Sequence, residues 1–248
     1  NIEQQFGKDM PTIRGDGVTN LHLKDINALD GSSRFKVQNS VDTLNISLDH
    51  VGINLDTTGS LGVSTLNLSV DGSSQINLTD GDDLVTLNIS GSNGAYLAFG
   101  PNPVSQATGN DGLTHVNITG DVDVSSDFTT DDNLVAVDNS GNAGDVIIAV
   151  NGDTDGGAID GGVDYAGGTG GDILWVASNT DATITLGDGD DFLVYQGAQF
   201  GADGSADGGT GRDTLAMFVA DAATATATGD FETHISNFES VNLTNEGT

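Results

Sequence analysis

Four short segments rich in glycine and aspartate carry the residue types that bind a hard metal ion. Two of them, 167–175 (GGTGGDILW) and 208–216 (GGTGRDTLA), match the pattern G-G-x-G-x-D-x-U-x at every specified position, where U is aliphatic. A third, 186–194 (LGDGDDFLV), lacks only the first glycine, and a fourth, 78–86 (LTDGDDLVT), keeps the central glycine, the aspartate and the aliphatic residue. This nonapeptide is typical of calcium-binding turns in stacked β-structures.

The spacing of the segments indicates how they could hold calcium. In each one we expect the first six residues to form a turn, because glycine lets the backbone bend and present its carbonyl groups beside the aspartate. The last three residues would form a short strand with the aliphatic side chain in the core. Calcium takes about six to eight oxygen ligands, more than one turn supplies. Since Asp172, Asp191 and Asp213 are 19 and 22 residues apart, we expect the acidic turns to stack along one edge and share ions.

The overall composition supports a role for cations in folding. The chain has 37 acidic residues against 6 Lys and Arg, a formal net charge of −31, and all the acids except Glu3, Glu232, Glu239 and Glu246 are aspartate. Hydrophobic residues make up only 36% and aromatic residues 5%, so the core must be thin. Repulsion between like charges opposes a compact state, and bound metal would relieve it and add to the folding free energy.

The composition also argues against several classes of protein. A nucleic-acid partner is not expected, because phosphate would meet charge of the same sign. The absence of cysteine excludes disulfides and thiolate metal sites. The sequence contains no run of 18 apolar residues, so a membrane-spanning helix is not expected. The four histidines (His22, His50, His115 and His234) are scattered without zinc spacing, and no G-x-S-x-G elbow occurs. We therefore expect no enzyme and no catalytic residues.

Short alternating stretches predict an all-β fold. Apolar and polar residues alternate over three to six positions between Gly, Asp, Ser and Asn, which is typical of strands. Strand starts recur about every ten residues, so two strands and their turns make a unit of about twenty. A sandwich would also suit many short strands, but the similarity of the strands and of their turns favours a right-handed parallel β-helix or β-roll solenoid. The expected strands are 44–48, 66–70, 76–78, 87–89, 116–118, 134–137, 146–150, 173–176, 184–186, 192–194 and 215–219.

Two segments do not follow the strand pattern, and the composition divides the chain into three parts. A helical turn is possible over 24–29, and the Ala/Thr stretch 220–228 is ambiguous. Five of the six basic residues (Lys8, Arg14, Lys24, Arg34 and Lys36) lie in the first 36 positions. We therefore divide the chain into an N-terminal cap or junction (1–40), a solenoid with degenerate repeats (41–150) and a calcium-binding β-roll with closing strands (151–248).

Six asparagines fit the N-x-[ST] pattern: Asn45, Asn67, Asn77, Asn88, Asn117 and Asn242. The pattern marks acceptors of N-linked glycans in secreted proteins. It also suits an alternating strand whose asparagines stack from coil to coil and hydrogen-bond through their amides. The repetitive strand context favours the stacked asparagines.

With these nonapeptides the chain resembles the RTX (repeats-in-toxin) proteins, and in particular the large RTX adhesins and the related bacterial surface-layer proteins. Two further features carry the resemblance: the Thr-Leu-Asn type strands at 65–69 and 86–90, and the closing phrase 235–243 (ISNFESVNL). The specific motifs cover about residues 160–245. The first 150 residues resemble the family only in the general character of their strands and turns. The resemblance implies calcium-binding β-rolls and export by type I secretion to the cell exterior or cell surface.

The resemblance also implies a set of metal ligands. The family's aspartate ligand falls on Asp172, Asp191 and Asp213, with Asp188 and Asp190 as additional carboxylates. The fourth nonapeptide adds Asp80, Asp82 and Asp83 as candidates. Because the nonapeptides are not in uninterrupted tandem, a regular calcium ladder is not expected. The glycines that would supply carbonyl ligands are Gly168, Gly170, Gly187, Gly189, Gly209 and Gly211.

Together these observations predict a secreted calcium-binding structural module of a surface-layer type assembly. Its partner would be a second copy of the chain, with a cell-surface polysaccharide as a further partner. The alternatives are an RTX adhesin segment that binds ice or sugar and the calcium-binding secretion tail of an extracellular enzyme. A polysaccharide-active enzyme is a third class, for which clustered carboxylates and aromatics would be needed.

Overall fold

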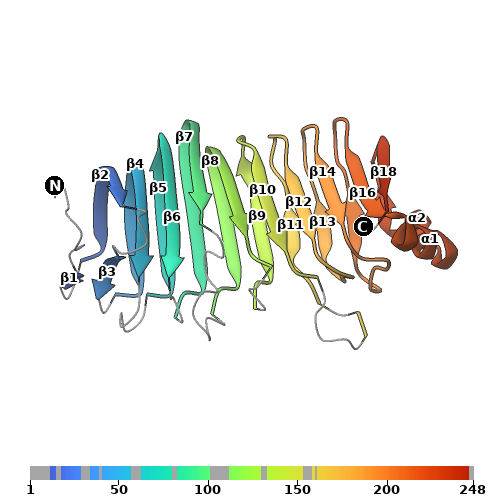
Figure 1. Cartoon of the computed structure of the whole chain (residues 1–248), viewed down its shortest axis with the longest axis horizontal. Helices are drawn as coiled ribbons and strands as arrows, with labels where there is room; N and C mark the ends of the chain where they lie inside the picture. Colours follow the sequence, from blue (N-terminus) through green and yellow to red (C-terminus); the bar gives the residue numbers. More distant parts are fainter. Residues whose placement is uncertain are drawn as a thin grey trace.

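Parallel strands stack coil upon coil along a single axis to form a β-solenoid of about eight turns (Figure 1). A computed structural model of the chain describes residues 12–14, 18–28, 34–38, 41–56, 63–79, 83–100, 112–129, 133–152, 158–159 and 161–245. All the pairings between named strands are parallel, as predicted for a β-helix.

Each coil contributes to two ladders of strands. We call the first ladder sheet A. Its strands are β2 (Asn20–Ala28), β4 (Thr43–Asp56), β5 (Thr65–Asp71), β7 (Thr86–Phe99), β8 (His115–Asp127), β9 (Ala136–Asn142), β11 (Asp164–Ala166), β13 (Thr183–Thr185), β15 (Ser205–Asp207) and β17 (Ile235–Ser236).

The second ladder is sheet B. The long strands β2, β4, β7 and β8 run through both ladders, and their C-terminal halves belong to sheet B. The remaining strands of sheet B are β1 (Thr12–Arg14), β3 (Arg34–Gln38), β6 (Ser73–Thr79), β10 (Val146–Val150), β12 (Ile173–Val176), β14 (Phe192–Tyr195), β16 (Thr214–Phe218) and β18 (Ser240–Thr244).

Strand pairings continue across the expected segment boundaries. β2 pairs with β4, and β10 pairs with β12. The segments 1–40, 41–150 and 151–248 therefore differ in composition within one continuous set of paired strands.

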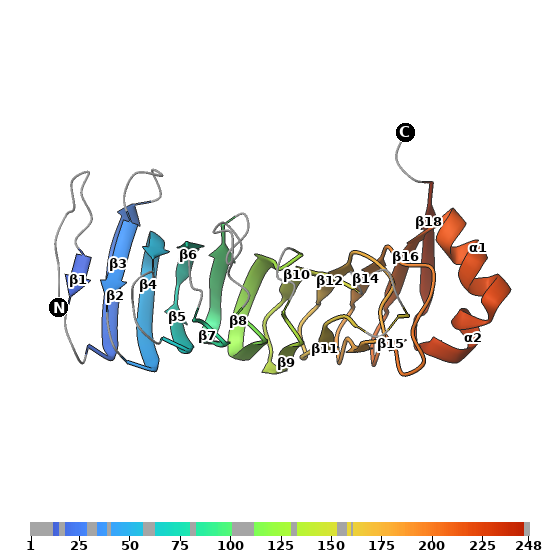
Figure 2. The same ribbon diagram turned by 90° about the horizontal axis from the view of Figure 1, so that it is seen from below.

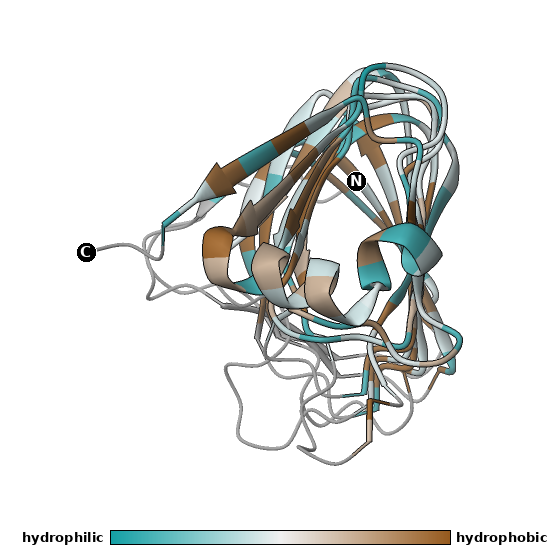
Figure 3. Cartoon of the chain, turned by 90° about the vertical axis from the view of Figure 1, so that its right-hand side faces the viewer, coloured by the Kyte–Doolittle hydropathy of each residue, from teal (hydrophilic) through white to brown (hydrophobic). Residues whose placement is uncertain are grey.

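The core is a stack of aliphatic side chains between the two sheets. Leu44, Leu66, Leu87 and Val116 occupy the same register position in four successive coils, and all four are buried. The aliphatic residues of the three C-terminal nonapeptides, Leu174, Leu193 and Leu215, are buried too, as predicted. Period-two alternation therefore places one apolar layer inside each coil, and Figure 3 shows the coils end-on, coloured by hydropathy.

The expected helical turn at 24–29 is wrong, because β2 runs through to Ala28. Leu23 and Ile26 both face the core, and their three-residue separation resembles a helical period. The separation arises instead at a corner, where Asp25 adopts φ 53° and the chain passes from sheet A to sheet B. His50 has φ 54° at the same point of the next coil.

The ambiguous Ala/Thr stretch is helical. Helices α1 (Val219–Thr228) and α2 (Asp230–His234) are inserted between β16 and β17 and lie at the C-terminal end of the solenoid (Figure 2). Alanine has the highest helix propensity, and the hydroxyl groups of Thr224, Thr226 and Thr228 donate to carbonyls four residues earlier. Ala222 and Ala225 are buried, so α1 covers part of this end of the core.

Asparagine side chains form a ladder on the outer face of sheet A. The Nδ2 groups of Asn67, Asn88 and Asn117 each donate to the Oδ1 atom of the asparagine one coil earlier, at 2.7 Å, and Asn45 donates to Asn20 at 3.1 Å. Asn77 makes the same contact with Asn54 on sheet B, at 2.7 Å. The predicted stacking of asparagines is therefore confirmed at five of the six positions. Asn242 instead lies exposed on β18.

Replacing one member of the ladder by aspartate is expected to destabilise the fold. In Asn88→Asp a carboxylate oxygen replaces the amide that donates to Asn67, so two acceptors face each other. We expect a loss of about 1–3 kcal/mol in the free energy of unfolding, measured by urea denaturation. Asn242→Asp adds the same charge at an exposed position of the same motif and should cost much less. Equal losses in the two variants would contradict a stabilising role for the ladder.

Candidate metal centre

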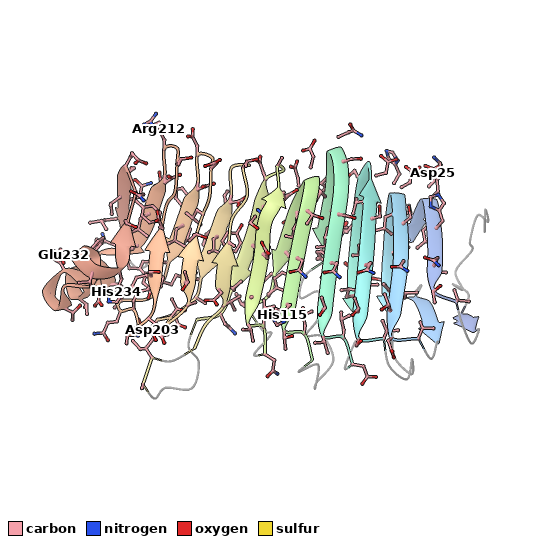
Figure 4. The ribbon with its side chains drawn as sticks, turned by 180° about the vertical axis from the view of Figure 1, so that it is seen from behind. Asp25, His115, Asp203, Arg212, Glu232 and His234 are labelled. Atoms are coloured by element: carbon pink, nitrogen blue, oxygen red, sulfur yellow. The ribbon has the colours of Figure 1, made fainter. Side chains whose placement is uncertain are left out.

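The strand register brings the three C-terminal nonapeptides onto one edge of the solenoid. We call it the A-to-B edge, because the chain passes there from sheet A to sheet B. Ile173 pairs with Phe192, and Phe192 pairs with Thr214. The residues just before them, Asp172, Asp191 and Asp213, therefore lie one above another in successive coils, as predicted. Arg212 marks this edge in Figure 4, and Asp203 lies on the opposite edge.

The same register position changes its chemistry along the solenoid. In the three preceding coils it holds Leu97, Val124 and Val146, which face the core and are at most 2% exposed, and one coil earlier it holds the buried Ser74. In the last coils it holds carboxylates instead. These are Asp172, Asp191, Asp213 and Glu239, which we call the carboxylate column.

Backbone hydrogen bonds hold one oxygen of each carboxylate. Oδ1 of Asp172 accepts from the N–H of Val146 at 3.0 Å, and Oδ1 of Asp191 accepts from the N–H of Asp172 at 2.7 Å. Asp213 accepts from Asp191 at 2.9 Å, and Oε2 of Glu239 accepts from Asp213 at 2.8 Å. Each side chain therefore reaches the coil before its own and is fixed in direction.

The second oxygens of the carboxylates differ in their partners. Oδ2 of Asp172 accepts from Asn139 and from the Tyr165 hydroxyl, each at 2.9 Å, and from the N–H of Gly168 at 3.4 Å. In contrast, Oδ2 of Asp191 and of Asp213 is buried and has no hydrogen-bond partner within the described part of the chain. An unsatisfied buried oxygen is costly, so these two atoms are the carboxylate oxygens of the column that are free to bind a cation.

The glycines of the turns allow the coils to approach closely at the carboxylate column. A methyl group added at Gly211 would lie 1.6 Å from the carbonyl oxygen of Gly189, and one at Gly209 would lie 1.9 Å from that of Gly187. Gly211 also has φ 146°, which side-chain-bearing residues rarely adopt. The carbonyl groups of adjacent turns are thus stacked beside Asp191 and Asp213. Gly168 and Gly170 stack in the same way on Asn142 and Gly144 of the coil before.

The other predicted carboxylates do not join the column. Asp188 and Asp190 are exposed on the outside of their turn, where Asp188 accepts from the Thr210 hydroxyl and Asp190 from the N–H of Arg212. Asp83 is exposed in the connection between β6 and β7, on the edge where the chain returns from sheet B to sheet A. The fourth nonapeptide therefore lies on the opposite edge. Asp80 and Asp82 lie outside the described residues.

Side chains alone do not build a metal site here. Across the described ranges, no group of three or more His, Cys, Asp or Glu side chains could hold a metal ion. Calcium takes about six to eight oxygens and accepts backbone carbonyls as ligands. Two stacked carboxylates, each with an unsatisfied oxygen, beside stacked glycine carbonyls fit a hard cation better than any other ligand class. The fit is best between the turns of Asp191 and Asp213, because Asp172 already has four donors.

Burial changes the acidity of the column. Burial is the main reason that the pKa of Asp191 is raised to about 7. The hydrogen bond from the N–H of Asp172 lowers this pKa, and the carboxylates of Asp172 and Asp213 raise it further. Burial also raises the pKa of Asp172 and of Asp213. Strands lie about 4.8 Å apart, and two unit charges at that separation repel by about 3 kcal/mol at an effective dielectric constant of about 20. Without a cation, the column therefore favours bound protons.

In calcium-free buffer, stability is expected to fall as the pH rises from about 4 to about 7. The folded state keeps a proton on Asp191 that the unfolded state, with a pKa near 3.8, has released. This contribution is fully present below the unfolded pKa and is lost as the pH passes the folded pKa. The thermal midpoint measured against pH would show the decline, and Asp191→Asn should flatten it more than Asp188→Asn. A midpoint that rises over this interval in calcium-free buffer would contradict the buried column.

Three contributors to the site were missed in the sequence. Glu239 follows Asp213 by one coil, and the closing phrase that contains it was available as a signal. Asn139 and Tyr165 bind Asp172, but they lie outside the nonapeptides and only the register identifies them.

Comparison of the chain with protein-family models, with curated proteins and with solved structures finds no match. Among the residues described, no helix is long and apolar enough to cross a membrane.

Proposed function

We propose that this chain is a secreted, calcium-stabilised structural module of a bacterial cell-surface assembly, like the RTX-type surface-layer proteins it resembles. The observation that carries the proposal is the pair of buried, unsatisfied oxygens on Asp191 and Asp213. Without a cation, aliphatic residues at this position, such as Leu97, Val124 and Val146 in the three preceding coils, would stabilise the fold more than carboxylates do. The carboxylates are explained if calcium binds there.

A calcium ion would supply positive charge and coordination between neighbouring coils. Asp191 and Asp213 would hold it through their second oxygens, and the glycine carbonyls of the adjacent turns would complete the shell. With the charge neutralised, the last coils could close on one another. Because a preformed site does not exist in the unfolded chain, the binding free energy would become folding free energy. Extracellular calcium modules typically bind in the range of roughly 0.1–1 mM.

The C-terminal end supports self-association as the second part of the function. β18 pairs with β16 on one side, and within the described ranges no strand pairs with its other edge. All five of its residues are exposed, including Val241 at 48% and Leu243 at 53%. An exposed strand edge with apolar side chains is a template for another chain.

Charge favours a second copy of the chain as the occupant of β18. Five of the six basic residues lie in the first 36 positions, whereas the C-terminal end is acidic. The first 36 positions also hold five acidic residues, so the N-terminal end is neutral overall and would repel the acidic C-terminal end of another copy less than a net-acidic surface would. Such a head-to-tail contact is heterologous and extends into a filament unless the rotation closes it.

Light scattering across a calcium titration tests the proposed assembly. We expect the mass to rise with calcium between about 0.1 and 1 mM, because folding of the last coils orders β18. Replacing both Val241 and Leu243 by Thr should keep the calcium-dependent circular dichroism and reduce the growth. A monomer at every calcium concentration, in protein that circular dichroism shows to be folded, would overturn the assembly role.

A further inference from the structure

The outer face of sheet B carries a hollow beside the only tryptophan of the chain. Trp175 is 44% exposed on β12, and Ile147 is 45% exposed on β10. A hollow of about 240 Å³ lies next to them. The lining residues that matter here are Gly100, Ser125, Asp127, Ile147, Ala149 and Trp175.

Differences in side-chain size along the register create the hollow. Ala149 on β10 pairs with Trp175 on β12 and with Asp127 on β8. Ser125 on β8 pairs with Ile147 on β10. Small residues therefore form the floor, while the indole ring stands at one side and the carboxylate at the other. The strands that carry them are fixed by parallel pairing, so the hollow is preformed.

The two walls of the hollow have different chemistry. Trp175 and Ile147 supply an apolar wall with a flat aromatic ring. Ser125 and Asp127 supply a hydroxyl and a carboxylate. Oδ1 of Asp127 already accepts from the N–H of Thr129 at 3.0 Å and from its hydroxyl at 2.6 Å. These two bonds orient the carboxylate before any ligand arrives.

A ligand for this hollow must be apolar on one face and rich in hydroxyl groups at its rim. A pyranose ring has this character, because its C–H groups can pack on an aromatic face while its hydroxyls bind carboxylate and hydroxyl groups. The ligand must also carry no negative charge. The chain has a net charge of −31, which repels anions. Asp123 and Asp145 add negative charge at the A-to-B edge, where the N–H of Asp145 donates to Oδ1 of Asp123.

We propose that this hollow binds one uncharged pyranose unit of an extracellular glycan. Trp175 stacks on the C–H face of the sugar, and Asp127 and Ser125 bind its hydroxyl groups. The site lies on the outer face of sheet B, whereas Asp172, Asp191 and Asp213 of the carboxylate column are buried. The sugar would therefore not touch the proposed calcium ligands, although β12, which carries Trp175, belongs to the coils whose folding we propose depends on calcium.

The emission of the single tryptophan reports directly on the hollow. In calcium-containing buffer we would titrate the methyl glycosides of glucose, galactose, mannose and N-acetylglucosamine, followed by cellotetraose and chitotetraose. A saturable shift of the emission with at least one of these sugars is expected. Asp127→Asn should weaken the binding by about tenfold, as loss of a charged hydrogen bond does. Asp123→Asn removes a charge outside the hollow and should leave the affinity unchanged.

Several results would overturn the sugar site. One is no saturable change with any of these sugars up to its solubility limit. Another is binding that is equally strong in Asp127→Asn and in Trp175→Phe, the latter followed by NMR. Emission that shifts with protein concentration in the absence of sugar would instead identify this face as a contact between copies. Circular dichroism of each variant in calcium would confirm that it folds.

Discussion

Removal of calcium is expected to unfold the last coils of the solenoid and leave the first coils folded. The coils from β11 onward contain the carboxylate column, whereas the coils of β7 to β10 have Leu97, Val124 and Val146 at the same position. In a solenoid each coil contacts only its neighbours, so stability can differ along the axis. Hydrogen exchange with and without chelator should show protection lost in 161–245 and kept in 41–150.

Asparagine variants separate metal binding from a purely structural role for the column. In Asp213→Asn, Oδ1 can still accept from the N–H of Asp191, which it does at 2.9 Å in the native protein, but the charge is gone. We expect the variant to be more stable than the native protein in chelator, since repulsion is reduced, and less stable in calcium. Asp188→Asn removes a charge from the outer side of the neighbouring turn and should show no such crossing. Loss of stability in both conditions would indicate a structural carboxylate without a metal.

Gly211→Ala is expected to be among the most damaging single substitutions in the C-terminal coils. The new methyl group would lie 1.6 Å from the carbonyl oxygen of Gly189, a backbone atom that cannot move without separating two coils. The φ of 146° adds backbone strain of about 1–3 kcal/mol. We expect a total loss of at least about 3 kcal/mol in calcium, measured by denaturant unfolding, with weaker calcium binding.

Gly94→Ala is the matched control for this substitution. Gly94 also has a positive φ, of 66°, but a methyl group there would meet no atom within 4 Å. Its expected cost is therefore the strain alone, about 1–2 kcal/mol. If the two alanine variants lost the same stability, close stacking of the turns could not be the reason for glycine at 211.

The fold was largely predictable because one physical pattern repeats in every coil. Alternation in segments such as 44–48 and 66–70 predicted strands, and similar turns predicted stacking. The error at 24–29 has a local cause, because a corner residue with positive φ gave two core residues a helical spacing. The helix α1 was ambiguous because an Ala/Thr stretch has no apolar period strong enough to separate helix from strand.

The site was only partly predictable because a motif specifies a turn but not its position in the coil. The spacing of Asp172, Asp191 and Asp213 correctly indicated a stack on one edge. The fourth nonapeptide, with Asp83, is similar in sequence but lies on the opposite edge, since β6 precedes it and β7 follows. Which aspartates face the core also depends on the register: Asp191 is buried, while its neighbour Asp190 is exposed.

The most direct test is a crystal structure of the protein grown in calcium chloride, with anomalous diffraction data. The proposal predicts an anomalous peak at the A-to-B edge, within bonding distance of Oδ2 of Asp191 and of Asp213 and of glycine carbonyls from the adjacent turns. A well-ordered structure with no peak there, in which both oxygens are hydrogen-bonded to protein or water, would contradict it.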